Sequence, residues 1–413
     1  MNNKTKNTLS RRCLRLILPV LALLGAACVY CISADEKAAA SLPPCPISAP
    51  MDSIFRSLFP SENEPGAIVE VMRHGQIIYR GCFGIADLES HSPITDSTVF
   101  NISSTSKLFS VAGIMKLVEE GRISLDDNLS DFFPEFPDNV FKHITIRHIL
   151  THTSGLPDLQ PQNEQNWREF TSGNRTPFAN LRDFQLFGSE DEHIKVFSQL
   201  TATPWPPGTH YNSFDPTLTL LAPLLERITG ENYDTWMRLN IFEPAGMTET
   251  FYYKVGGSNP KMAHAYRPSV PGEKLPGAYQ SPDGKWQEYD YGEVPYFLTK
   301  SNRGLFTSAR SFMRWINKLY DGEIISQESL SQMGVERVEV GVPHSFFGYG
   351  TAVRLEPGYP RKNYHINRNG AFSIIDGTWP EQHTSYIIFS NRNDWDMRTT
   401  AAKVDSIIKA NYF

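Results

Sequence analysis

The 413-residue chain is poor in cysteine and lacks common metal-binding motifs. Its five cysteines are Cys13, Cys28, Cys31, Cys45 and Cys82, and no cluster of cysteine and histidine has the spacing of metal ligands. No HExxH sequence occurs. We therefore expect neither a metal site nor another cofactor.

The main part of the sequence also lacks an excess of positive charge. The formal net charge is −6, from 39 Lys and Arg against 45 Asp and Glu. Residues 1–34 contain five basic residues and no acidic one, so the other 379 residues hold 34 basic against 45 acidic residues and carry −11. A nucleic-acid-binding protein usually presents a positive field. We therefore expect no nucleic-acid partner.

No apolar run reaches the ~20 residues that a membrane span needs. The most apolar segment, 16–27, follows basic residues that end at Arg15, and Ile32-Ser33-Ala34 offers a cleavage site of small residues. This pattern predicts a signal peptide over 1–34 and an exported protein in the periplasm or on the cell envelope. An uncleaved membrane anchor is the alternative, and Cys28 would permit attachment as a lipoprotein.

Removal of residues 1–34 would leave only Cys45 and Cys82. These two thiols could form one disulfide in an oxidising compartment, or both could remain unpaired. Their spacing does not decide between the two states.

Hydrophobic periodicity predicts a folded domain over 51–413, preceded by a proline-rich linker over 35–50. Strands at both ends of this domain enclose helices, which indicates an α+β protein whose first and last segments share one sheet. Residues 158–198 and 252–299 show no clear period, and loops of that length are usually functional. The predicted strands are 67–73, 76–80, 372–376 and 385–390, and the predicted helices are 101–120, 216–229, 308–319 and 399–409.

The start of the helix predicted over 101–120 contains an S-x-x-K sequence, Ser104-Thr105-Ser106-Lys107. Residues three apart lie on one face of a helix, so Lys107 can reach the Ser104 hydroxyl. A serine becomes a good nucleophile when a neighbouring base takes its proton, and a desolvated lysine can be that base. An ordinary helix cap followed by a surface lysine would give the same four residues.

The surrounding segments favour the catalytic interpretation. The informative ones are 65–67, 84–87, 100–107, 121–127, 144–157, 207–209, 224–230, 241–247 and 304–310. Together they resemble the serine beta-lactamase and penicillin-binding-protein superfamily, and the likeness spans roughly residues 60–395. It is greatest to the branch that holds class C beta-lactamases, esterases and D-amino-acid peptidases.

The resemblance implies a beta-lactamase/DD-peptidase-like fold, with an antiparallel sheet flanked by helices and an interleaved, mostly helical lobe. The α/β lobe would comprise about 51–105 and 300–413, and the helical lobe about 106–299. It also implies acyl transfer, in which Ser104 attacks a carbonyl group and Lys107 accepts its proton. The partner would be a small-molecule or peptide substrate.

The second motif of that superfamily, Y-x-N or S-x-N, aligns with Ser213-Phe214-Asp215. Ser213 is expected to relay a proton near Lys107. Asp215 replaces an asparagine, so a donor to substrate is lost, and its charge could hold Lys107 protonated. Tyr211 could substitute for the usual tyrosine if the loop is shifted.

The third motif, H/K-x-G, aligns with His365-Ile366-Asn367. His365 is expected to act on the hydroxyl groups as a relay or through its charge. Asn367 replaces the glycine that lets substrate approach the backbone, and it therefore puts a side chain in the substrate site.

His148 and His152 are four residues apart, as metal ligands on a helix can be. They lie in the 144–157 segment of the family pattern, so we expect them to pack and to make hydrogen bonds in a loop.

Two functions remain open at this stage. The first is an exported serine hydrolase that cleaves an ester, a D-amino-acid peptide or a lactam, with the ester or the peptide favoured because the second and third motifs are altered. The second is a weak or inactive relative that keeps the fold as a binding module.

Overall fold

The structure is a computed structural model that describes residues 42–156, 190–213, 216–252, 259–272, 279–289 and 299–413. The predicted signal peptide over 1–34 lies outside the described residues. So do Asp215 and most of the segment 158–198. Residues Cys45–Phe413 form one unit by their contacts.

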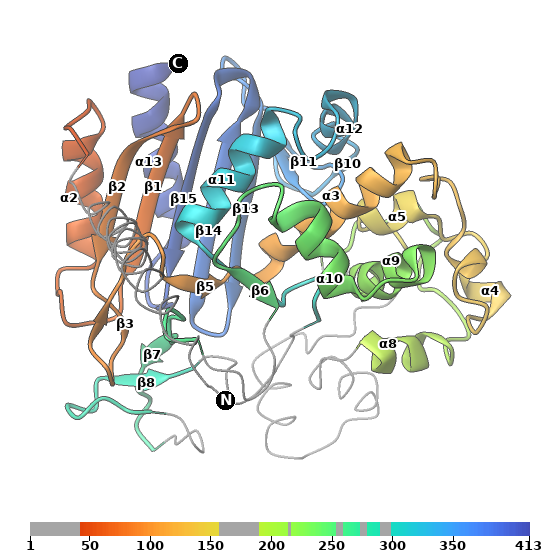
Figure 1. The fold of residues 1–413 in the computed structure, drawn as a ribbon, viewed down its shortest axis with the longest axis horizontal. Coiled ribbons are helices and arrows are strands. Elements are labelled where there is room, and N and C mark those ends of the chain that lie inside the picture. The colour runs from red at the N-terminus through yellow and green to blue at the C-terminus, as the bar shows by residue number, and fades with distance from the viewer. Residues whose placement is uncertain (1–41, 157–189, 214–215, 253–258, 273–278, 290–298) are drawn as a thin grey trace, which may run out of the picture. The chain divides into compact units, whose positions relative to one another are not determined.

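An antiparallel sheet of eight strands is the centre of this unit (Figure 1). The hairpin of β1 (Ala67–Arg73) and β2 (Gln76–Phe83) joins the sheet through β15 (Thr384–Ser390), with Ala67 opposite Ser390 and Arg73 opposite Thr384. The first and last segments therefore share one sheet, as predicted, and within it β1 and β15 are neighbours. In spatial order the strands are β10 (Val338–Glu339), β11 (Ser345–Phe347), β12 (Ala352–Arg354), β13 (Lys362–Asn369), β14 (Phe372–Trp379), β15 (Thr384–Ser390), β1 (Ala67–Arg73) and β2 (Gln76–Phe83).

Helices cover both faces of the sheet (Figure 1). Because side chains alternate along a strand, Val69 and Val71 of β1 join a core with α2 (Ser48–Leu58) and α13 (Met397–Tyr412). Ile68 and Met72 point to the other face, where α11 (Ala309–Tyr320) and α3 (Ser106–Glu119) pack. The larger core, which is built around α3, lies on this second face.

The chain between the two sheet segments is mainly helical. Three small sheets accompany these helices: β3 (Ile85–Asp87) with β4 (Ser92–Pro93), β5 (Val99–Asn101) with β9 (Leu305–Ser308) and β6 (Thr250–Tyr252), and β7 (Tyr266–Pro268) with β8 (Trp286–Glu288). The remaining helical elements are η2 (Ser103–Thr105), η3 (Leu129–Asp131), α4 (Asp138–Phe141), α5 (Ile146–Leu150), α8 (Glu190–Phe197), η4 (Pro216–Leu220), α9 (Leu221–Thr229), α10 (Tyr233–Met237), the π-helical turn η5 (Arg238–Phe242), α12 (Gln327–Met333) and η6 (Pro380–Gln382).

Three predictions need correction. Helix α2 begins at Ser48, inside the predicted linker, because Pro50 falls in its first turn, where a missing N–H costs nothing. The helix predicted over 101–120 begins only at Ser106, since Asn101 ends a strand. The segments left unassigned contain α8, β7 and β8, and β10 to β12 are too short to be recognised from a period.

Two of the five cysteines, Cys45 and Cys82, lie among the described residues. Cys45 and Cys82 are both unpaired. In the part of the chain that the structure describes, no helix is long and apolar enough to cross a membrane.

Asn391 connects the two ends of the domain. Its side chain is fully buried, accepts a hydrogen bond from the Gly66 N–H at 2.8 Å, and donates to the carbonyls of Ile85 at 3.0 Å and His264 at 2.9 Å. Gly66 is required here, because a Cβ at this position would lie 1.9 Å from the Phe83 carbonyl oxygen.

Asn391→Ala should therefore lower the free energy of unfolding by about 3 kcal/mol, since it leaves several buried backbone groups without partners. Equilibrium unfolding in urea measures this loss. Asn393→Ala is the control, and it should change stability by less than ~0.5 kcal/mol because that half-buried side chain makes no hydrogen bond with a described residue. Equal losses in the two variants would contradict the role of Asn391.

Candidate active site

Ser104 lies in the 3-10 turn η2, between strand β5 and helix α3. Ser103 before it has a φ of +54°, a left-handed conformation that residues other than glycine seldom adopt. Two hydrogen bonds hold the turn: the Ser103 N–H donates to Asn101 Oδ1 at 2.9 Å, and Ser106 Oγ donates to the Ser103 carbonyl at 2.6 Å.

The Ser104 side chain is half-buried. Neither its hydroxyl nor its N–H has a hydrogen-bond partner among the described residues. The hydroxyl is thus available for attack, and the N–H at this helix start can donate to a developing oxyanion.

Lys107 lies one helical turn after Ser104, and its side chain is only 7% exposed. The positive charge of Lys107 interacts with two histidines, His152 and His365. Burial lowers the pKa of His152 well below its ordinary value, and the charge of Lys107 lowers it further, so His152 is neutral. His152 Nδ1 lies 3.1 Å from the Asn212 carbonyl, which can only accept, and therefore carries the proton. His148 bonds within the Thr145 cap, so both histidines make loop hydrogen bonds as expected.

His365 is buried between two acceptors. Its Nδ1 lies 3.0 Å from Asp376 Oδ2, and its Nε2 lies 3.1 Å from the Gly350 carbonyl. A carboxylate and a carbonyl only accept, so both ring nitrogens carry protons and His365 is an imidazolium. Burial alone would lower the pKa of His365, but the charge and the hydrogen bond of Asp376 outweigh it and the pKa is raised.

This geometry favours one of the two roles predicted for His365. Both nitrogens are occupied, and no hydrogen bond joins the ring to Ser104 among the described contacts. A relay of protons would require a free nitrogen. His365 therefore contributes a fixed positive charge near Lys107, with which it interacts.

Asn367 is tied to the turn that holds Ser104. Its Nδ2 donates to Thr105 Oγ1 at 2.9 Å, and Thr105 Oγ1 donates to Asp376 Oδ1 at 3.2 Å. Thr105 thus links the third motif to the carboxylate that holds His365. A second hydrogen bond connects β13 to the residues before the turn: Asn369 Nδ2 donates to Asn101 Oδ1 at 2.9 Å.

One edge of β13 is open next to this turn. β12 pairs only with Lys362–Tyr364, so from His365 onwards this edge has no strand neighbour in the described sheet. The turn η2 contacts this same part of β13. An extended substrate could form backbone hydrogen bonds there.

The second motif is only partly described. Ser213 is exposed, and its backbone lies against His152. Asp215 lies outside the described residues. Tyr211 is half-buried and stacks on the His152 ring with 5.9 Å between centroids, and burial raises its pKa. The proton relay by Ser213 and the substitution by Tyr211 stay predictions, because no hydrogen bond of either side chain to Ser104 or Lys107 is described.

Sequence reasoning missed Asp376, Thr105 and the tautomer of His152. Asp376 lies on β14 directly opposite His365, a pairing that depends on strand register and leaves no local signal. In the described residues no group of three or more His, Cys, Asp or Glu side chains could hold a metal ion.

The structure thus combines three features: a sheet covered by α11, an S-x-x-K sequence at the start of α3, and a histidine on β13. Residues 51–408 match the family described as Beta-lactamase. The chain belongs to the beta-lactamase family.

Two proteins that are similar to this chain, one in sequence and one in structure, are named as hydrolases. Esterase EstB of Burkholderia gladioli is 29% identical over 220 residues, which are 52% of this chain and 54% of EstB. The structure of EstCE1, a hydrolase with promiscuous acyltransferase activity, has a TM-score of 0.68 at 20% identity and covers 88% of this chain and 97% of that one.

A penicillin-binding protein homologue shares the fold as well. The octameric homologue from Pyrococcus abyssi has a TM-score of 0.71 at 20% identity, and the match covers 88% of this chain and 77% of that one. The family and these relatives together support serine acyl-transfer hydrolysis in general terms.

The ion pair of His365 makes stability depend on pH. A folded-state pKa above the unfolded value means that the stabilisation is complete below about pH 6.5 and is lost as the pH rises through the folded pKa. Asp376→Asn should cost about 3 kcal/mol of unfolding free energy at pH 6 and clearly less at pH 9.5. Urea unfolding at the two pH values measures both numbers.

Asp394→Asn is the matched control, because Asp394 pairs with Arg392, whose charge does not titrate in this range. Its cost should be the same at pH 6 and pH 9.5. A cost of Asp376→Asn that is equally independent of pH would show that His365 is not charged.

Proposed function

We propose that the protein is an exported serine hydrolase that forms an acyl-enzyme on Ser104. The observation that supports this most directly is the unpartnered, half-buried Ser104 hydroxyl, one helical turn from the buried Lys107. Export rests on the predicted signal peptide over 1–34.

Lys107 would act as the general base. Its charge disfavours protonation of His365, and this repulsion is mutual. The fixed charge on His365 therefore favours the neutral amine that a base requires. Lys107 takes the proton of Ser104 Oγ as that oxygen bonds to the substrate carbonyl carbon, and the Ser104 N–H stabilises the oxyanion. The leaving group departs with a proton, and water then releases the acid.

An ester or a peptide is a better candidate substrate than a lactam. Asn367 occupies the place of the glycine in the third motif and is held against Thr105. A bulky ring that must approach the β13 backbone would meet this side chain. A narrower, extended acyl group can use the open edge of β13.

The alternative is a catalytically weak or inactive binding protein. The same Asn367 contact supports it, since a side chain that bridges to the catalytic turn narrows the site. Reactivity of Ser104 separates the two functions.

A labelled fluorophosphonate should modify Ser104 in the full chain, as located by peptide mass, and Ser104→Ala should abolish both the adduct and ester hydrolysis, with kcat/KM reduced by about 10³-fold or more. Ser103→Gly is the matched control. It removes the neighbouring hydroxyl and suits the φ of +54°, so labelling at Ser104 should persist. No labelling of the wild type, together with no turnover of an ester panel, would leave the binding function.

Asn367→Gly should increase acylation of Ser104 by a labelled penicillin by about tenfold, because it frees Thr105 and opens the β13 backbone. Gel fluorescence against time measures the acylation rate, and Asn367→Ala should give a smaller gain. An unchanged rate in both variants would show that Asn367 does not limit lactam binding.

A further inference from the structure

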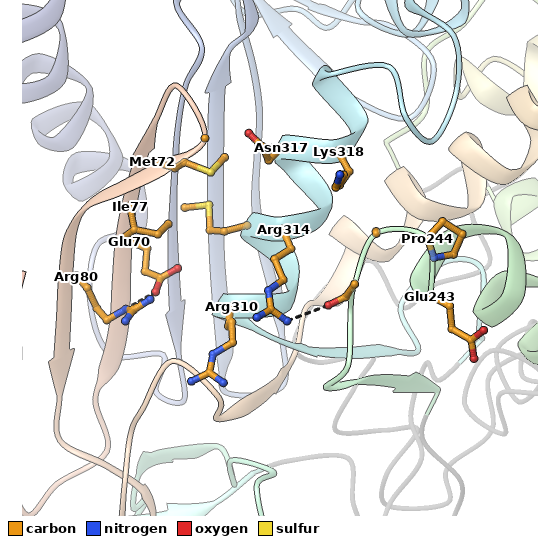
Figure 2. Close-up of a pocket in the computed structure, with 14 residues that line it drawn as sticks. Glu70, Met72, Ile77, Arg80, Glu243, Pro244, Arg310, Arg314, Asn317 and Lys318 are labelled. Atoms are coloured by element: carbon orange, nitrogen blue, oxygen red, sulfur yellow. Dashed lines mark hydrogen bonds and ion pairs between the residues drawn. The ribbon is translucent and has the colours of Figure 1, made fainter. Parts of the chain in front are cut away.

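One pocket of the described structure has neither Ser104 nor Lys107 in its lining. It has a volume of about 460 Å³, within the ~300–1,000 Å³ range of small-molecule sites. Figure 2 shows its walls: the hairpin β1–β2 on one side, one face of α11 along the middle, and Glu243 and Pro244 on the far side. None of the site residues described above lines it.

Glu70 forms part of this pocket's wall and is unusual for its position. It lies in β1, whose other positions from Ala67 to Met72 are apolar, and alternation places it on the α11 face with Ile68 and Met72. Its side chain is fully buried. Arg80 Nε donates to Oε1 at 2.5 Å, while Oε2 has no hydrogen-bond partner within the described part of the chain.

A buried carboxylate oxygen without a donor is costly. Burial raises the pKa of Glu70, although the charge of Arg80 opposes this rise. In Figure 2 the Glu70 carboxylate points from the strand towards α11. A ligand group with an N–H would supply the missing donor.

The cations around the pocket differ in their partners. Arg80 and Arg310 both pair with Asp96, at 3.1 and 2.7 Å, and Lys318 pairs with Glu323. Arg314, which is exposed, donates to the Gly246 carbonyl at 3.1 Å and has no carboxylate partner among the described residues (Figure 2). Its guanidinium can therefore bind an anionic group of a ligand.

The wall between Glu70 and Arg314 is apolar. Met72 and Met313 are buried, and Ile77 is half-buried. Methionine side chains are flexible and adapt to apolar groups of different shape.

We propose that this pocket binds a small apolar carboxylate that also carries an amide N–H, of the chemical class of N-acylated apolar amino acids and short apolar peptides. The carboxylate pairs with Arg314 at the mouth, the apolar side chain contacts Met72, Ile77 and Met313, and the N–H donates to Glu70 Oε2.

Charge fixes this orientation. A carboxylate placed at the Glu70 end would be repelled by that buried group, whereas at the mouth it meets the Arg314 guanidinium, which has no carboxylate partner among the described residues. An ammonium at the Glu70 end would lie near Arg80 and Arg310, so a neutral N–H is the better donor there.

Three probes separate the contributions of the two groups. N-acetyl-leucine carries both the carboxylate and the N–H, 4-methylpentanoate lacks the N–H, and N-acetyl-leucinamide lacks the charge. Isothermal titration of the full chain should show that N-acetyl-leucine binds and that each of the other two binds at least fivefold more weakly.

Two variants locate the site. Arg314→Gln, at an exposed position, should weaken N-acetyl-leucine binding at least tenfold and leave N-acetyl-leucine and N-acetyl-leucinamide almost equal in affinity. Glu70→Gln should remove the advantage of N-acetyl-leucine over 4-methylpentanoate. The control is Arg398→Gln on α13, an exposed arginine on the opposite face of the sheet, and it should leave the affinity unchanged.

The proposal is overturned by any of three results: no detectable binding up to roughly 10 mM N-acetyl-leucine, equal binding of the three probes, or an unchanged affinity in Arg314→Gln. Because Arg314 is exposed, its variant remains informative even if Glu70→Gln fails to fold. Reactivity of Ser104 is not involved in any of these measurements.

Discussion

The charged contact between His365 and Asp376 is the interaction on which the site depends. It joins β13 to β14, and through the Gly350 carbonyl it also fixes the segment before β12. Thr105 extends the same contact to the turn that carries Ser104. A single buried imidazolium, held between a carboxylate and a carbonyl, thus connects segments that are far apart in the sequence. Hydrogen bonds of Thr105 to Asp376 and Asn367 then tie the turn that carries Ser104 to the third motif.

The fold could be predicted wherever burial follows a regular period. The alternation in β1 and the helical spacing in α11 are both local patterns, and both elements were correct to within a few residues. Prediction failed where the deciding cause was not local. Ser103 adopts its left-handed conformation because Asn101 and Ser106 hold the turn, and no apolar period records those hydrogen bonds.

The residues of the site likewise fall into those that the sequence could predict and those that it could not. Ser104 and Lys107 could be recognised because their spacing alone brings them to one side of a helix. Asp376 could not, because the register of β13 and β14 places it opposite His365 and it meets Thr105 across 271 residues. Asn367 was predicted to intrude on the substrate site, and the structure shows how it is held, by a bond to Thr105 that the sequence does not reveal. Glu70 is the opposite case: a charge in an apolar strand is visible in the sequence, but its unpartnered oxygen is visible only in three dimensions.

The pairing of β1 with β15 constrains the order in which the protein can form. The ribosome synthesises the hairpin β1–β2 first. Its neighbour in the described sheet is β15, which ends at Ser390, more than 300 residues later. Asn391, which closes the junction, is the next residue. During synthesis the N-terminal hairpin therefore remains without its neighbour until almost the whole chain has left the ribosome, and contacts of such long range make folding slow.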